Sequence, residues 1–408
     1  MLDLLRRNRN FRLLWIAQVV SYLGDWFTTV AVLGEVKDLT DSPLATTMVL
    51  VCQLLPSFLV TPWAGPLADR IDRRRILIIV STLQAGCALA FLAIGPGRVW
   101  IAFAAMSSVA ALGGFFAPAS QAALANLVET RDLPTAGSIM GSTWGAMLAI
   151  GAALGGAFTV AFGRDAAFVV DAASFVVAAA LIAAIRAPMQ ASRTTNSKQR
   201  MRPIADTAEA LHRARKDPEL LALLWSKAGF GLAGGVVGLL AVLATDTFHG
   251  GDGSIGLLLA GRGIGAVSGP LIARRLIVSS NIPATVKICA YASLVYGAGY
   301  LLVSVSPSLA LTCLLVLIAH LGGGTQWTLS SIGLQLVTPD DIRGRVLAAD
   351  MALVTLTMSI SSFTAGALAE AASPRVVIGG FSILALAWGA LYVAIGRRLC
   401  VDRSPPHT

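Results

Sequence analysis

The sequence is poor in charge: only 13% of its 408 residues are Asp, Glu, Lys or Arg, whereas 56% are hydrophobic. The mean hydropathy is correspondingly high, at +0.74. A water-soluble domain carries about twice this share of charged residues, so an ordinary soluble fold is excluded. Hydrophilic stretches long enough for a sizeable soluble domain are also lacking. The lipid bilayer is therefore expected to be the solvent of this chain.

The sequence also lacks the motifs of common enzymes and cofactor-binding proteins. It contains no Walker phosphate loop, no HExxH helix, no Gly-x-Ser-x-Gly elbow and no cluster of metal ligands. The five cysteines form no CxxC pair and are interpreted as small buried apolar residues. The glycine-rich stretch 261–265 lies within an apolar run, which excludes a nucleotide site there. We expect no enzymatic activity, no metal and no cofactor.

Apolar runs of membrane-spanning length are abundant. About 20 apolar residues cross a bilayer as a helix, and a helix satisfies its own backbone polar groups within lipid. We predict an all-α integral membrane protein whose 12 transmembrane helices form two pseudo-symmetric six-helix bundles. The expected spans are 11–36, 44–64, 76–94, 98–119, 135–162, 166–185, 219–245, 254–273, 284–305, 308–330, 346–371 and 376–396.

The longest hydrophilic stretch, 187–218, divides these spans into two sets of six. It predicts an N-terminal bundle over 1–186, a cytoplasmic linker over 187–218, a C-terminal bundle over 219–396 and a cytoplasmic tail over 397–408. A short internal repeat supports the division, because 65–70 has a counterpart at 269–274 after the equivalent helix of the second half.

The basic residues are distributed unequally between the two predicted membrane faces. With this topology, 24 Lys and Arg residues lie on the face that carries both termini and the linker, and 4 lie on the other face. Cytoplasmic loops are enriched in Lys and Arg, so both termini are predicted to be cytoplasmic. This asymmetry explains the net charge of +9 without nucleic acid as a partner.

The charged link 65–75, with the sequence GPLADRIDRRR, joins the second and third apolar runs. It resembles the loop motif of the major facilitator superfamily, except that Asp72 stands where the family often has a second glycine. Further stretches resemble its enterobactin-exporter and macrolide-efflux group of drug:proton antiporters. These stretches are 7–15, 24–26, 118–122, 171–175 and 339–346.

This resemblance implies a secondary exporter with a cytoplasmic gate. In such proteins the acid of the link faces the start of helix 11, where a helix N-terminus favours a nearby carboxylate. Here that acid is Asp69, and the two arginines Arg343 and Arg345 lie at the start of helix 11. The arginines of the link are expected to pair with Glu129, Asp132 or Asp350 or with anionic lipid, or else only to set topology. The predicted gating residues are Gly65, Asp69, Arg70, Arg73, Arg74, Arg343 and Arg345.

Helix 1 carries the strongest candidate for transport chemistry. Gln18, Tyr22, Asp25 and Thr29 are spaced so that they share one helical face, and we predict that this face binds substrate. A carboxylate deep in the membrane faces a cavity or a partner, and loss of water favours its protonated form. Asp25 either carries a coupling proton or meets cationic cargo, or else makes a structural hydrogen bond.

Four polar residues of the second half are further candidates. His320 and Gln326 are predicted to line the substrate site, although a lone His bonded to a carbonyl is the commoner arrangement. Lys227 is expected either to reach the cytoplasmic face with its ammonium group or to act within the membrane. Arg262 is expected to pair with a carboxylate or with carbonyl groups.

The leading hypothesis is a proton-coupled exporter of small amphipathic molecules, such as drugs, macrolides or siderophore-like compounds, working by alternating access. We expect a monomer in the inner (plasma) membrane whose partners are its small-molecule substrate, protons and the lipid bilayer. The alternatives are a facilitator or importer of a metabolite or lipid-like compound on the same fold, and a membrane sensor without transport. The polar face of helix 1 and the charged link favour transport.

Overall fold

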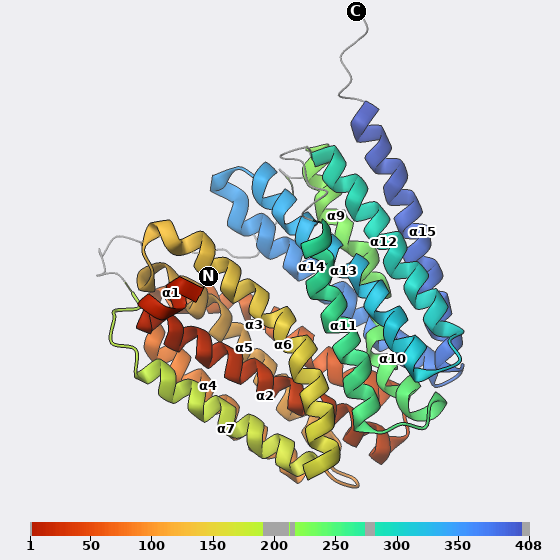
Figure 1. The fold of residues 1–408 in the computed structure, drawn as a ribbon, viewed down its shortest axis with the longest axis horizontal. Coiled ribbons are helices and arrows are strands. Elements are labelled where there is room, and N and C mark those ends of the chain that lie inside the picture. The colour runs from red at the N-terminus through yellow and green to blue at the C-terminus, as the bar shows by residue number, and fades with distance from the viewer. Residues whose placement is uncertain (1, 191–211, 213–216, 274–281, 402–408) are drawn as a thin grey trace, which may run out of the picture. The chain divides into compact units, whose positions relative to one another are not determined.

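The computed structural model describes residues 2–190, 212, 217–273 and 282–401, and these residues contain helices and no strand (Figure 1). Twelve of the described helices or helix runs are long and apolar enough to cross a membrane. Each coincides with one of the 12 predicted spans, so the prediction of an all-α protein with 12 transmembrane helices is confirmed.

The chain forms two compact units. Unit 1 comprises Met1–Met201 with His249–Ala260, and unit 2 comprises Arg202–Phe248 with Gly261–Thr408. The predicted boundaries of the bundles stay a prediction, because most of the linker 187–218 lies outside the described residues.

Unit 1 contains the first six spans. In its interior α2 packs against α6 and α7, α3 packs against α5, and α4 packs against both α5 and α7. Buried apolar side chains such as Phe11, Leu77 and Met140 form the core between them. The helices are α1 (Leu2–Arg7), α2 (Arg9–Thr40), α3 (Pro43–Arg70), α4 (Arg73–Ala90), α5 (Trp100–Leu127), α6 (Leu133–Phe162) and α7 (Arg164–Ala183).

Unit 2 is arranged around α9, which contacts α12, α13, α14 and α15, while α12 also packs along α13 and α15. The start of α11 is assigned to unit 1 and the remainder to unit 2. The helices are α9 (Pro218–Ala233), α10 (Val236–Val242), α11 (Asp252–Ala273), α12 (Ile282–Ser304), α13 (Leu309–Val337), α14 (Asp340–Ala369) and α15 (Pro374–Val401).

The seventh span, expected as one helix over 219–245, is interrupted. α9 ends at Ala233 and α10 begins at Val236, because the backbone of α14 approaches at this point. A Cβ on Gly235 would stand 2.2 Å from the Ser361 carbonyl oxygen, so only glycine fits there. The Ser361 hydroxyl accepts a hydrogen bond from the Gly235 amide (2.9 Å) and donates to the Leu232 carbonyl. The free backbone groups are thereby satisfied, as a lipid environment requires.

The charged link is shorter than the sequence indicated. Residues 65–70 continue α3 as helix, and α4 begins at Arg73, so that only Ile71 and Asp72 lie between the two helices. Asp72 caps α4, since its carboxylate accepts a hydrogen bond from the Arg75 amide at 3.0 Å. The apolar run of α3 ends at Ala64, and the charged last turns of the helix extend beyond it to Arg70.

Candidate functional site

Two hydrogen-bonded pairs follow one another along the predicted polar face of α2. The Gln18 amide donates to the Tyr22 hydroxyl (3.0 Å), and the Thr29 hydroxyl donates to the Asp25 carbonyl (2.7 Å). From α3, the Gln53 amide donates to the Thr29 hydroxyl at 3.1 Å. Gln18 and Thr29 are buried, whereas Tyr22 and Asp25 are half-buried. The predicted face is therefore polar along its length, and its role in substrate binding stays a prediction.

A second carboxylate, Asp171 of α7, lies beside Asp25. Asp171 is 1% exposed and accepts hydrogen bonds from the hydroxyls of Thr28 (2.7 Å) and Ser174 (3.4 Å). It packs against the residue before Asp25, since a Cβ on Gly24 would stand 2.5 Å from Asp171 Oδ1. Two ionised carboxylates here would repel one another electrostatically. The sequence placed Asp25 on a polar face, but this like-charge pair was missed.

The Asp25 carboxylate makes no ion pair or hydrogen bond with the described residues. The hydrogen bond from Thr29 goes to the backbone carbonyl of Asp25 and not to its side chain. With a rise of 1.5 Å per residue, Asp25 lies about 24 Å along α2. Arg164, by contrast, is the first residue of α7 and belongs to the helix ends. The two acids therefore lie deep in unit 1 without a described cation beside them.

Arg164 binds three acids at the ends of the unit 1 helices. Its guanidinium contacts Glu35 (2.9 Å), Asp38 (2.7 Å) and Asp252 (2.8 Å). Gly34 makes room for this cluster, because a Cβ there would stand 1.9 Å from Asp252 Oδ1. The fork of the guanidinium suits this multiple pairing, which a lysine would not reproduce.

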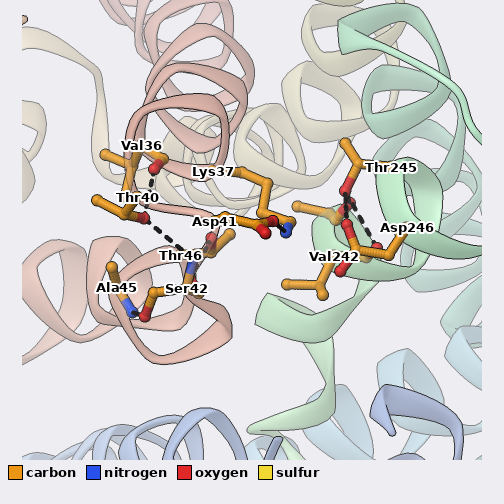
Figure 2. A network of polar contacts seen from close by, with 11 residues as sticks. Val36, Lys37, Thr40, Asp41, Ser42, Ala45, Thr46, Val242, Thr245 and Asp246 are labelled. Atoms are coloured by element: carbon orange, nitrogen blue, oxygen red, sulfur yellow. Dashed lines mark hydrogen bonds and ion pairs between the residues drawn. The ribbon is translucent and has the colours of Figure 1, made fainter. Parts of the chain in front are cut away.

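Figure 2 shows the neighbouring corner between α2 and α3, where buried Lys37 pairs with Asp41. The hydrogen bond from Lys37 lowers the pKa of the exposed Asp41 carboxyl. The Ser42 hydroxyl caps α3 by accepting from the Ala45 amide at 3.0 Å. The figure also draws the Thr245 hydroxyl of unit 2, which donates to Asp246 at 3.0 Å.

Lys227 and Asp350 form an ion pair inside unit 2. Their side chains are 1% and 2% exposed, so Lys227 does not extend to the membrane surface. Its ammonium group also donates to the Ser331 hydroxyl (2.8 Å) and lies 5.0 Å from the centre of the Trp327 ring. Each charge lies about 14–15 Å from the start of its helix. Opposite charges at equal depth in α9 and α14 were the sequence signal for this pair.

Arg262 of α11 lies among aromatic side chains. Tyr296, Tyr300 and His320 are within electrostatic reach of its guanidinium. The expected partner was a carboxylate or a carbonyl group, but no hydrogen bond or ion pair joins Arg262 to any described residue, and its Nε is enclosed. The expectation of a paired arginine is therefore wrong for the described residues.

The two other predicted substrate residues of unit 2 are buried. His320 is 2% exposed, and its Nε2 lies 2.9 Å from the Tyr300 hydroxyl. Gln326 is enclosed between α9 and α12, where it donates to the Ser226 carbonyl and accepts from the Ser293 hydroxyl (3.3 Å). The amide of Gln326 thus joins helices in this structure, and its predicted contact with substrate stays a prediction.

The basic residues predicted at the gate mostly bind backbone carbonyls. Arg73 donates to Ala122 (2.9 Å) and Met189 (3.3 Å), Arg74 donates to Ala187 (2.8 Å), and Arg343 donates to Thr338 (3.1 Å). Arg70 is exposed and Arg345 is half-buried. Of the expected acidic partners, Asp132 is bound by Arg7, Glu129 by Arg131 and Asp350 by Lys227. The surroundings of Gly65 and Asp69 lie outside the described part of the chain.

A family model described as "Transmembrane secretion effector" matches residues 5–400. The chain belongs to this transporter family of the major facilitator superfamily. Family membership explains the 12 helices, and it makes the polar groups inside the membrane candidates for transport rather than for enzyme chemistry. Among the described residues, no group of three or more His, Cys, Asp and Glu side chains could hold a metal ion.

Three transporters of Bacillus subtilis are similar to this secretion-effector chain. YfiS, an MFS-type transporter, is 25% identical over 220 residues, covering 53% of this chain and 52% of YfiS. YkuC, also MFS-type, is 25% identical over 251 residues, covering 59% of this chain and 57% of YkuC. BacE, a candidate bacilysin exporter by its name, is 22% identical over 356 residues, covering 86% and 87%. The matches to YfiS and YkuC thus span little more than half of those proteins.

Solved transporter structures share the fold. A POT family transporter in complex with 5-aminolevulinic acid aligns with a TM-score of 0.77 at 9% identity, covering 96% of this chain and 97% of that one. A bacterial homologue of the human lysosomal transporter Spinster aligns with a TM-score of 0.74 at 14% identity, covering 98% and 99%. At these identities the likeness concerns the fold alone.

Proposed function

We propose that this transporter is a proton-coupled exporter that moves small amphipathic molecules by alternating access. The observation that carries the proposal is the Asp25–Asp171 pair, in which two acids approach each other deep in unit 1. Two negative charges this close in a poorly hydrated site are costly, and binding one proton removes the repulsion. A group that gains and loses a proton during each cycle is what coupling to a proton gradient requires.

Asp25 is the member of the pair that we assign to proton exchange. Asp171 is enclosed and already accepts two hydrogen bonds, whereas the Asp25 side chain is half-buried and free of described partners. A proton on Asp25 can therefore be exchanged with water or displaced by cargo without first breaking protein hydrogen bonds. Gln18, Tyr22 and Thr29 continue the polar face to which cargo would bind.

The orientation we propose places both termini and the 187–218 linker in the cytoplasm, with the protein acting as a monomer in the inner membrane. The support is the 24-to-4 distribution of Lys and Arg over the two faces. When fused within 187–218, a reporter that works only in the cytoplasm should be active, and one that works only in the periplasm should be inactive. Activity of a periplasmic reporter there would reverse the orientation and the side on which the gate is placed.

The test is transport by purified protein in liposomes under an imposed pH gradient, with fluorescent dyes and macrolides as cargo. We expect cargo to move in the direction opposite to the flow of protons down their gradient. A protonophore or the substitution Asp25→Asn should abolish this movement. Asp165→Asn is the matched control, because Asp165 is an exposed acid of the same α7 helix that carries Asp171. Undiminished proton-driven transport by the Asp25→Asn protein would remove Asp25 from coupling, and transport indifferent to the gradient would refute proton coupling itself.

A further inference from the structure

Arg262 places a positive charge inside unit 2 that no described carboxylate of this unit balances. It lies about 15 Å from the start of α11, near the middle of a bilayer. Among the described spans of unit 2, Asp350 is the one acid away from the helix ends, and Lys227 already binds it. A cation at such depth normally has a partner. The unpaired guanidinium, with its enclosed Nε, therefore has capacity for an anion.

The position of Arg262 on α11 turns it away from lipid. Ile272 in the last turn of α11 is exposed, and three further exposed apolar residues, Leu257, Ile264 and Leu271, are seven residues apart and form a stripe. At about 100° per residue, Arg262 lies roughly 140–180° from each residue of this stripe around the helix. Arg262 is half-buried, so the part of its side chain that remains accessible faces the protein side of α11 and not the hydrocarbon.

Close packing of α11 on α13 brings this arginine to the aromatic residues. A Cβ on Gly261 would stand 2.9 Å from the Cys313 carbonyl, and one on Gly265 would stand 2.2 Å from the Leu317 carbonyl and 2.9 Å from His320 Cβ. The two backbones therefore touch on both sides of Arg262. Side chains larger than glycine would separate the helices and move the guanidinium away from His320.

A second unsatisfied polar group lies in the same cluster. The Tyr296 hydroxyl is buried and makes no hydrogen bond of normal geometry, although it adjoins Tyr300. The Tyr300 hydroxyl is already held by His320 Nε2 at 2.9 Å. The Phe230 ring packs 4.9 Å from the Tyr296 ring and supplies an apolar wall. An unpaired guanidinium and an unpaired hydroxyl beside aromatic rings thus occur together within unit 2.

We propose that Arg262 and the Tyr296 hydroxyl bind the carboxylate of an anionic cargo, whose apolar or aromatic body lies against Phe230 and Tyr296. This assignment of the cargo class rests on the proposed export function. A carboxylate accepts two parallel hydrogen bonds from a guanidinium and also neutralises its charge, which a neutral amide cannot do. Aromatic rings favour a flat or apolar body next to that group.

The proposal is tested by binding to the purified full chain in a neutral detergent, without any gradient. The probes are benzoate, indole-3-acetate and octanoate, each compared with its amide, and Kd is obtained from the rise of Tm with ligand concentration. We expect at least one carboxylate to bind, and its amide to bind at least tenfold more weakly. Arg262→Gln should weaken carboxylate binding at least tenfold and abolish the preference over the amide. Lys287→Gln is the control, since Lys287 is an exposed cation of the same unit.

Several outcomes would overturn the proposal: equal binding of acid and amide, as at a site that holds only water; no binding by any of the three acids; or binding unaffected by Arg262→Gln. Stabilisation by chloride alone would also overturn it, in favour of a structural anion. If Arg262→Gln fails to fold, Arg262→Lys and Tyr296→Phe decide, because each must reduce the preference for acid over amide. Dye export without carboxylate binding would refute only this proposal, and carboxylate binding without gradient-driven export would refute only the proposed function.

Discussion

The interiors of the two units carry opposite unbalanced charge. Among the described Asp, Glu, Lys and Arg side chains of unit 1, those deep in the helices are two acids, Asp25 and Asp171, which would repel each other if both were ionised. The corresponding described side chains of unit 2 are two cations and one acid: Lys227 and Asp350 pair, and Arg262 has no ionic partner. A repeated fold thus holds two different electrostatic arrangements, each within its own bundle of helices.

This difference separates three roles for charge in a membrane. A like-charge pair favours the binding of a proton, an opposite-charge pair joins helices, and a lone cation favours an anionic ligand. Each role predicts a different response when one charge is removed. Substitutions in the two units therefore test the comparison directly.

The largest effect is expected from breaking the Lys227–Asp350 pair. Lys227→Met or Asp350→Leu alone leaves the other charge buried and unpaired, which should destabilise unit 2 by about 3–5 kcal/mol. Thermal unfolding in detergent measures this loss. The double substitution should restore most of the stability, because two apolar side chains replace the pair. Equal destabilisation by the double and single variants would show that the charges do not act as a pair.

The next effect concerns helix packing in unit 2. Gly265→Ala places a methyl group 2.2 Å from the Leu317 carbonyl, so α11 and α13 must separate, at a cost of about 1–3 kcal/mol. Gly141→Ala in unit 1 is the matched control, because nothing lies within 4 Å of its new methyl group. The apparent melting temperatures of the Gly265→Ala and Gly141→Ala proteins measure this difference in stability. A Gly265→Ala protein as stable as the Gly141→Ala control would contradict the close approach of the helices.

A smaller effect is expected at the charged link of unit 1, whose counterpart at 269–274 of unit 2 contains no acid. If Asp69 stabilises a closed cytoplasmic gate by about 1–2 kcal/mol, Asp69→Asn will raise the open population roughly 5–30-fold and slow turnover. Cysteine labelling at the end of α3 and the start of α14, the helix ends that would close this gate, measures that population. Asp72→Asn is the control, because asparagine preserves the cap of α4. Unchanged labelling and turnover would mean that Asp69 is not a gate.

The smallest effect on stability is expected from Asp171→Asn. Asparagine can still accept from the Thr28 and Ser174 hydroxyls, and the repulsion with Asp25 disappears, so stability should change by less than about 1 kcal/mol. This result would contrast with the large loss at Lys227 or Asp350. The same unfolding assay applies, and a loss of 3 kcal/mol or more, roughly what a broken ion pair gives, would show that Asp171 has a cationic partner after all.

The number of helices was predictable because a bilayer requires about 20 apolar residues per crossing, which the sequence displays directly. Helix ends were less predictable, since α3 continues through charged residues to Arg70 and the seventh span breaks near Gly235. The break depends on the approach of Ser361 from α14. No local pattern around Gly235 reports a neighbour 126 residues away.

The candidate site was predictable along single helices and not between them. The 4-3-4 spacing placed Asp25 with Gln18, Tyr22 and Thr29, but nothing in that pattern indicates that Asp171 of α7 faces the same point. Arg262 was expected to have a partner on general grounds. Its isolation depends on a contact between two other helices, in which Lys227 binds Asp350, the one deep acid among the described residues of unit 2.

The interruption between α9 and α10 has a mechanical consequence. The Ser361 hydroxyl bridges the end of α9 and the start of α10, because it accepts a hydrogen bond from the Gly235 amide and donates one to the Leu232 carbonyl. Sliding of α14 along the broken helix would release both bonds at once, in a region where water is scarce. The interruption is thus held together by a side chain of another helix. We therefore expect α9, α10 and α14 to move together as one rigid body. Slow deuterium exchange at the Gly235 amide would show that its hydrogen bond to Ser361 persists.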